Sequence, residues 1–133
     1  MYLELLKQKL LAMKPNLLFK LSGIILLING LAAAFTSELF LKGAGMTLDS
    51  DGITTAQAFG ASLIALGITV FRIPSFVGNV KEAITTVILG HSTFVILIAV
   101  HLVNGRAEGP TPLVNLILNL LFITLYLIAR KKA

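Results

Sequence analysis

Residues 83–103 read AITTVILGHSTFVILIAVHLV, and this uncharged stretch decides the fold. As an α-helix with a rise of ~1.5 Å per residue it would be ~31 Å long, about the thickness of the hydrocarbon core of a bilayer. The stretch nevertheless carries polar side chains, namely Thr85, Thr86, His91, Ser92, Thr93 and His101. Because unpaired polar groups are costly in lipid, we expect further membrane-spanning helices to cover them.

The composition of the whole chain is typical of a membrane protein. Of its 133 residues, 56% are hydrophobic and only 13% are charged, whereas soluble domains have roughly 25% charged residues. The chain contains no cysteine, which excludes disulfides, thiol catalysis and cysteine-bound metals. The net charge of +5 comes from basic residues that flank apolar segments. It therefore indicates membrane topology and contact with the lipid bilayer, and no nucleic acid is expected as a partner.

The remaining apolar segments predict an all-α, polytopic membrane protein that folds as a bundle of four transmembrane helices. The expected spans are residues 17–35, 55–72, 83–103 and 112–130 within a single membrane domain, residues 1–133. Residues 1–16 are predicted to be an amphipathic N-terminal segment, which either lies on the membrane surface or extends the first span into the cytoplasm.

Residues 36–55 are the longest polar connection between the expected spans. Ser37 is expected to cap a short helix, and the apolar residues of this segment predict that it lies against the membrane surface. Residues 49–52 are expected to form a turn, and residues 54–57 have the spacing of a capping box that starts the second span. Pro74 is expected to end that span.

Glycines recur one heptad apart in the first two spans, as Gly23 and Gly30 and as Gly60 and Gly67. Small residues on one stripe of a helix let two backbones approach closely. We therefore predict that the first two spans pack against each other through these glycines, in preference to a dimer interface.

Basic residues gather on one side of the predicted topology. The side that holds both termini has nine Lys and Arg residues, whereas the other side has only Lys42 and Arg106. Basic loops stay on the cytoplasmic side of a membrane. Both termini are therefore expected in the cytoplasm.

Six polar residues within or beside the spans are the candidate ligand-pocket residues: Asn29, Gln57, His91, His101, Asn115 and Asn119. The alternating helix directions place most of them in the outer half of the bundle, with His91 and Asn119 near the midplane. Lipid forces such groups to point inward. They either bond the helices to one another or line a polar pocket, and the sequence leaves both open.

His91 and His101 have three interpretations. Each could form a hydrogen bond to a neighbour inside the bundle, take part in a proton relay, or bind haem or a quinone. The two side chains would lie ~15 Å apart along one helix and ~80° apart around it. They cannot share a metal or a haem without a second chain, so no metal and no cofactor is predicted.

Three sequence stretches resemble a known family. They are GIILLING at residues 23–30, FTSELFLKGAG at residues 35–45 and AQAFGASLIALGI at residues 56–68. Together they resemble the small four-helix bacterial membrane proteins of the DoxX-like group over residues 17–103. The resemblance implies a four-helix fold in the bacterial inner (cytoplasmic) membrane. An arginine often precedes the Phe-Gly pair in that group, but Gln57 and Ala58 stand there in this chain, and no functional residue is carried over.

The sequence contains no catalytic constellation. There is no P-loop, no Ser-His-Asp set and no carboxylate inside a span. We therefore expect a non-enzymatic accessory or structural membrane protein, as a homo-oligomer or as a subunit of a larger membrane complex. The alternatives are a small-molecule binding or transport protein with a polar pocket in its outer half, and a haem or quinone carrier that uses His91 or His101.

Overall fold

The computed structural model describes residue 4 and residues 13–133, and helices dominate this part of the chain. The long elements are α2 (Pro15–Phe35), α4 (Ser50–Phe76), α5 (Val80–Val103) and α6 (Pro110–Lys132), with a short α3 (Ser37–Lys42) after α2. Each long helix is long and apolar enough to cross a membrane. The predicted all-α, four-helix architecture is confirmed. The predicted amphipathic segment, residues 1–16, lies largely outside the described residues.

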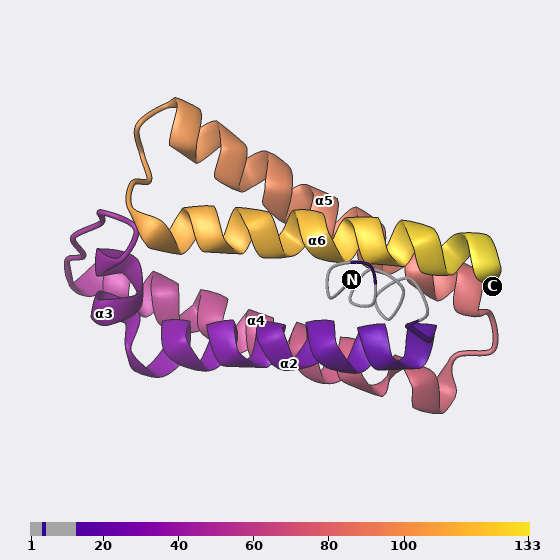
Figure 1. Cartoon of the computed structure of the whole chain (residues 1–133). Helices are drawn as coiled ribbons and strands as arrows, with labels where there is room; N and C mark the ends of the chain where they lie inside the picture. Colours follow the sequence, from indigo (N-terminus) through magenta and orange to yellow (C-terminus); the bar gives the residue numbers. More distant parts are fainter. Residues whose placement is uncertain (1–3, 5–12) are drawn as a thin grey trace.

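The bundle consists of two helix pairs (Figure 1). α2 packs along α4, α5 packs against α6, and α2 also contacts α6. Within the described residues, no comparable packing joins α4 to α5. The start of α2 and the end of α6 share one end of the bundle, here called the terminal end, whereas α3 and residues 104–109 form the loop end. The last turns of α5 diverge from α6 toward the loop end.

The close approach of α2 and α4 depends on the four predicted glycines. A Cβ atom built on Gly23 would lie 2.8 Å from the carbonyl oxygen of Gly67, and one built on Gly30 would lie 2.9 Å from that of Gly60. These are backbone atoms of the facing helix, which cannot move aside as a flexible side chain can. The prediction that the first two spans pack through their glycines is confirmed.

The most deeply buried side chains lie in the terminal half of the bundle. Phe19, Ile84 and Tyr126 are fully buried there and come from α2, α5 and α6. The hydroxyl groups of Ser22 and Tyr126 lie 2.7 Å apart and form a buried hydrogen bond between α2 and α6. This hydrogen bond satisfies two polar groups that lipid or apolar packing would leave without a partner.

The start of α4 differs from the prediction. α4 begins at Ser50, where a turn was expected, because the side chain of Asp49 accepts a hydrogen bond of 2.8 Å from the backbone N–H of Gly52 and caps the helix. The hydroxyl of Thr54 donates to the carbonyl of Ser50 instead of forming a capping box. The helix therefore starts about one and a half turns earlier than the expected span.

Two other helix ends were also predicted wrongly. Pro74 was expected to end the span but lies inside α4, which continues for two more residues to Phe76. Ser37 does not cap α3, since its buried hydroxyl donates to the carbonyl of Ala33 at 2.7 Å. The N-cap residue of α3 is Thr36.

Candidate functional site

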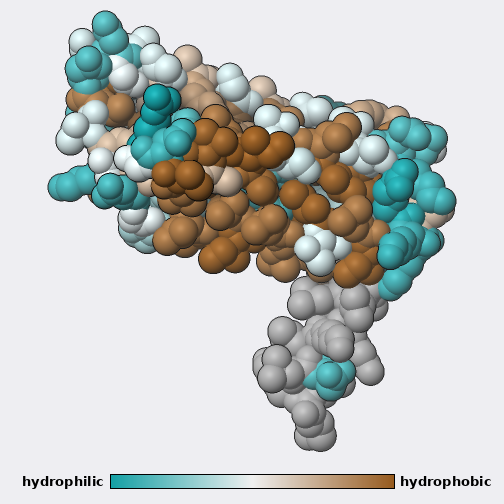
Figure 2. Space-filling view, turned by 90° about the horizontal axis from the view of Figure 1, so that it is seen from above, coloured by the Kyte–Doolittle hydropathy of each residue, from teal (hydrophilic) through white to brown (hydrophobic). Residues whose placement is uncertain are grey.

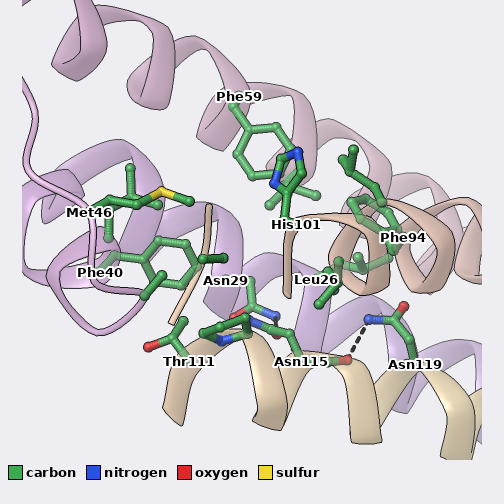
Figure 3. A pocket seen from close by; sticks show the side chains of 17 residues that line it. Leu26, Asn29, Phe40, Met46, Phe59, Phe94, His101, Thr111, Asn115 and Asn119 are labelled. Carbon is green, nitrogen blue, oxygen red and sulfur yellow. Dashed lines mark hydrogen bonds between the residues drawn. The ribbon is translucent and has the colours of Figure 1, made fainter. Parts of the chain in front are cut away.

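A cavity of about 280 Å³ lies in the half of the bundle nearer the loop end, and it is called the loop-end cavity below (Figure 3). Every helix from α2 to α6 contributes to its wall. The wall is mainly apolar and includes Leu26, Phe40, Met46, Phe59, Leu63 and Phe94. Its polar members are Asn29, His101, Thr111, Asn115 and Asn119.

Helix geometry places the asparagines of α2 and α6 together. Asn115 and Asn119 are four residues apart, so their side chains lie on one face of α6, and that face is turned toward Asn29 of α2. The Nδ2 atom of Asn29 donates a hydrogen bond of 3.0 Å to Oδ1 of Asn115. This bond joins the two helix pairs beside the cavity.

Several polar atoms of the cavity wall have no hydrogen-bond partner among the described residues. They are Nδ2 of Asn115, Oδ1 of Asn29 and both ring nitrogens of His101. None of these atoms is fully buried within the protein. The cavity therefore offers hydrogen-bond donors and acceptors within an otherwise apolar wall.

His91 lies beside the cavity but does not line it. Its side chain is only 6% exposed, and its ring stacks on Phe122 with a centroid distance of 5.4 Å. Nδ1 of His91 lies 2.6 Å from Oδ1 of Asn119. The Nδ2 atom of Asn119 donates to the carbonyl of Asn115 at 2.7 Å, so the amide oxygen is the atom that faces the histidine.

This arrangement assigns the proton of the imidazole. Because Oδ1 of Asn119 can only accept, Nδ1 of His91 must carry a hydrogen and donate it. In a neutral ring Nε2 is then an acceptor, and it is buried without a partner in the described residues. The hydrogen bond to a neighbouring helix is the one that the sequence led us to expect, whereas the proton-relay interpretation stays a prediction.

The structure brings together four of the six candidate residues. Asn29, His101, Asn115 and Asn119 line the cavity, and His91 is attached to it through Asn119. Gln57 does not belong to the group, because it is exposed on α4 and absent from the cavity wall. Its neighbour Ala56 is buried against α2, and the next residue of a helix is turned by ~100° from that face.

The apolar wall of the cavity was not predicted from the sequence. Phe40 of α3 and Met46 of the following loop were expected on the membrane surface, yet they close the cavity at the loop end. Phe59 and Phe94 were assigned no role, because each looks like an ordinary lipid-facing or core residue of a span. The one available signal was the number of large apolar side chains in a connection that otherwise reads as polar.

The backbone closes the cavity on the side of the loops. The N–H of Glu108 donates to the carbonyl of Ala44 at 2.8 Å, and the N–H of Thr111 donates to the carbonyl of Gly43 at 3.1 Å. Ala44 and Ala107 are buried beneath this contact. Gly109 has a φ of 83°, a left-handed conformation that favours glycine and lets the two loops meet. We call these paired segments, residues 43–44 and 107–111, the loop seal.

Hydrophobic residues cover the middle of the molecular surface, and hydrophilic residues gather at both ends of the bundle (Figure 2). With four apolar helices long enough to cross a bilayer, this pattern defines a multi-pass membrane protein. No family model, no curated protein and no solved structure matches the chain. The described residues contain no group of three or more His, Cys, Asp or Glu side chains that could hold a metal ion.

Proposed function

We propose that this membrane protein binds a small, mainly apolar molecule with a hydrogen-bonding group in the loop-end cavity. The observation that supports the proposal is the set of unpaired polar atoms on His101, Asn115 and Asn29 within an apolar wall. A polar atom within an apolar, lipid-surrounded wall is costly when it has no hydrogen-bond partner. Asparagines that served only to join helices would not leave a histidine and an amide nitrogen facing an open space.

The size of the cavity agrees with this proposal. A cavity of ~150 Å³ lined by apolar side chains holds benzene, and drug-sized ligands occupy roughly 300 Å³ or more. The volume of the loop-end cavity, about 280 Å³, is nearly twice that of the cavity that holds benzene. An amphiphile with a short chain or a single ring fits this range.

Binding is better supported than chemistry at this site. The described part of the chain contributes to the wall no carboxylate and no basic side chain except the imidazole of His101. The only hydroxyl group of the wall belongs to Thr111, and no base is hydrogen-bonded to it among the described residues. Such a wall can select and orient a ligand, but it offers no activated nucleophile.

Haem bound between the two histidines finds no support in this fold. His101 lines the cavity, whereas His91 does not, and Nδ1 of His91 is already bonded to Asn119. A haem held by both would need a second chain. The interpretation as an accessory or structural subunit, alone or as a homo-oligomer, stays a prediction that concerns surfaces other than the cavity.

The proposal includes an orientation. Basic residues of the described chain gather at the terminal end: Lys14, Lys20, Arg72, Lys81, Arg130, Lys131 and Lys132. Only Lys42 and Arg106 lie at the loop end. By the positive-inside rule the terminal end faces the cytoplasm, so the cavity lies in the outer half of the membrane. The resemblance to the DoxX-like group adds the bacterial inner membrane to this proposal.

Photolabelling with 3-azioctanol, a neutral alcohol that carries a diazirine, tests the proposed function. The protein in lipid nanodiscs is irradiated with the probe, and the labelled residues are mapped by mass spectrometry. We expect labelling that unlabelled 1-octanol displaces, concentrated on residues of the cavity wall. Labelling spread evenly over lipid-facing residues, with no displacement, would contradict the proposal.

A matched pair of substitutions on α5 provides the control. Ile98 lines the cavity, whereas Ile96 is 64% exposed and does not line it. Ile98→Trp should fill the cavity and reduce displaceable labelling at least about tenfold, which corresponds to ~1.4 kcal/mol. Ile96→Trp introduces the same side chain two residues away and should leave labelling unchanged. Equal effects of the two substitutions would also count against the cavity.

A further inference from the structure

The cavity lies between α4 and α5, which do not pack along each other as α2 and α4 do. Phe59 and Leu63 of α4 form one side of the wall, and Leu97 and His101 of α5 form the other. Figure 3 shows the side chains of Phe59 and His101 among those that line the cavity. Phe59 is 46% exposed and Leu97 is 50% exposed, although both line the cavity. The edges of α4 and α5 therefore form a mouth that faces the surroundings of the bundle.

The surroundings at this depth are lipid. Phe59 lies two and a half turns after the start of α4, and Leu97 lies almost two turns before the end of α5. Both positions fall inside helices that are apolar enough to span the membrane. A molecule that passes between Phe59 and Leu97 would come from the acyl-chain region and not from water.

Hydrogen bonds lie across two other routes into the cavity. On the side of the loops, the loop seal joins Ala44 to Glu108 and Gly43 to Thr111 through backbone hydrogen bonds. On the far side, a second hollow is lined by α2, α3 and α6 and shares four residues with the cavity: Asn29, Phe40, Thr111 and Asn115. The hydrogen bond between Asn29 and Asn115 lies across part of this boundary.

The chemistry of the wall selects the ligand. Among the described residues, the wall contains no Asp, Glu, Lys or Arg side chain. A charged headgroup would have to leave water and enter lipid and then an apolar cavity without a counter-charge, which is strongly unfavourable. Nδ2 of Asn115 can donate to an oxygen atom, and the two nitrogens of a neutral His101 supply one donor and one acceptor. A hydroxyl group or a carbonyl group satisfies these atoms.

We infer that the loop-end cavity takes up a neutral amphiphile sideways from the membrane, through the mouth between Phe59 and Leu97. The hydroxyl or carbonyl group of the ligand bonds to His101 and Asn115, and its apolar part lies against the aromatic wall and extends toward the lipid. This inference rests on the proposed function, to which it adds the chemical class of the ligand and its route.

The route is tested with a removable plug, which is a bulky group attached to an introduced cysteine. The chain contains no cysteine of its own, so each introduced cysteine is the single site of attachment. The variant Leu97→Cys in nanodiscs is treated with benzyl methanethiosulfonate, which attaches a bulky apolar group that a reductant removes. The probe 3-azioctanol is then added, and labelling of the cavity wall is followed over time. We expect the benzyl adduct to slow labelling at least about tenfold, and reduction to restore the original rate.

Two control variants separate the lipid route from the aqueous one. Ile96→Cys carries the same adduct on the adjacent, lipid-exposed position of α5 and should not slow labelling. Thr47→Cys lies exposed at the loop end, and its adduct should also have no effect. If the adduct at Thr47 slows labelling and the adduct at Leu97 does not, the inferred route is wrong.

Loading the probe before modification distinguishes a plug from a competitor. Probe that is already inside should stay and be labelled when the Leu97→Cys adduct forms afterwards. Loss of preloaded probe would show that the adduct fills the cavity, and it would overturn the assignment of a mouth. If unmodified Leu97→Cys and the native chain show no displaceable labelling at all, the proposed function itself fails. Labelling that is displaceable but is not slowed by the benzyl adduct refutes only the sideways route.

Discussion

His91 of α5 and Asn119 of α6 are joined by a hydrogen bond of 2.6 Å between Nδ1 and Oδ1. Asn119 also donates to the carbonyl of Asn115, so a single amide connects the histidine to the backbone at the cavity wall. The bond lies near the middle of both helices, where each partner would otherwise face an apolar environment. Removal of this hydrogen bond therefore tests directly whether polar side chains stabilise the bundle.

We expect a double-mutant cycle of His91→Leu and Asn119→Leu to show coupling between the two side chains. Each single substitution leaves the remaining side chain without its hydrogen-bond partner. The destabilisations caused by the two single substitutions should therefore sum to more than the destabilisation caused by the double substitution. Hydrogen bonds between membrane helices contribute ~0.6 kcal/mol on average and rarely more than ~1.7 kcal/mol. Reversible unfolding in mixed micelles measures this coupling.

Thr93 provides the control for this cycle. It lies exposed on α5, and its hydroxyl bonds to the carbonyl of Leu89 at 3.0 Å. Thr93→Ala and Asn119→Leu should therefore add without coupling. Additive effects for His91 and Asn119 as well would show that the hydrogen bond does not stabilise the bundle.

Substitution of the packed glycines should separate α2 from α4. In Gly23→Ala the new methyl group would lie 2.6 Å from the backbone nitrogen of Phe71 and 2.8 Å from the carbonyl oxygen of Gly67. Overpacking against backbone typically costs about 1–3 kcal/mol. We expect a lower free energy of unfolding by this amount, measured by the same micelle assay.

Gly90 of α5 is the matched glycine. A Cβ atom built on Gly90 meets nothing within 4 Å. Gly90→Ala should therefore leave the packing unchanged and stabilise the helix by about 0.5–1 kcal/mol, since alanine is the better helix former. Destabilisation of similar size by both substitutions would mean that the glycine contacts between α2 and α4 are not what holds them together.

The glycine contacts and the helix count were predictable because they depend on local pattern. An uncharged stretch such as residues 83–103 is stable in lipid as a membrane-spanning helix. Glycines seven residues apart on one face of such a helix indicate a close contact with another helix. The helix ends were less predictable, because Asp49 and Thr54 compete for the same role in capping α4. The sequence pattern favours the capping box, whereas the structure uses the aspartate three residues before Gly52.

The cavity could not be predicted from the sequence. Its polar residues were found because lipid forces Asn29, Asn115 and His101 inward. Its volume, however, depends on the divergence of α5 from its neighbours and on the position of Phe40, which are long-range properties of packing. Gln57 shows the same limit, since its inward direction was assumed from polarity, but the register of α4 on α2 turns it outward.

His101 should determine the affinity of the cavity for a neutral amphiphile. We expect His101→Phe, which keeps a ring but removes both nitrogens, to weaken displacement of 3-azioctanol by 1-octanol by about five- to tenfold. This corresponds to the ~1–1.4 kcal/mol of one hydrogen bond. The concentration of 1-octanol that halves the labelling of the wall is the measurement.

His101→Gln serves as the rescue, because an amide again supplies a donor and an acceptor at this position. It should bind 1-octanol more tightly than His101→Phe does. A purely apolar probe of similar size, such as octane, should compete equally well in both variants. If His101→Phe lowers the affinity for octane as much as for 1-octanol, the imidazole contributes shape and not hydrogen bonding.

The orientation of the bundle can be measured with single cysteines at the connecting segments. Lys42 ends α3 at the loop end, Lys81 lies in the first turn of α5 at the terminal end, and both are exposed. Because basic residues gather at the terminal end, the positive-inside rule places Lys81 in the cytoplasm and Lys42 outside. A membrane-impermeant maleimide added to intact cells should therefore label Lys42→Cys but not Lys81→Cys, and disruption of the membrane should make both variants reactive. Labelling of Lys81→Cys alone in intact cells would invert the orientation and place the loop-end cavity in the cytoplasmic half of the bilayer.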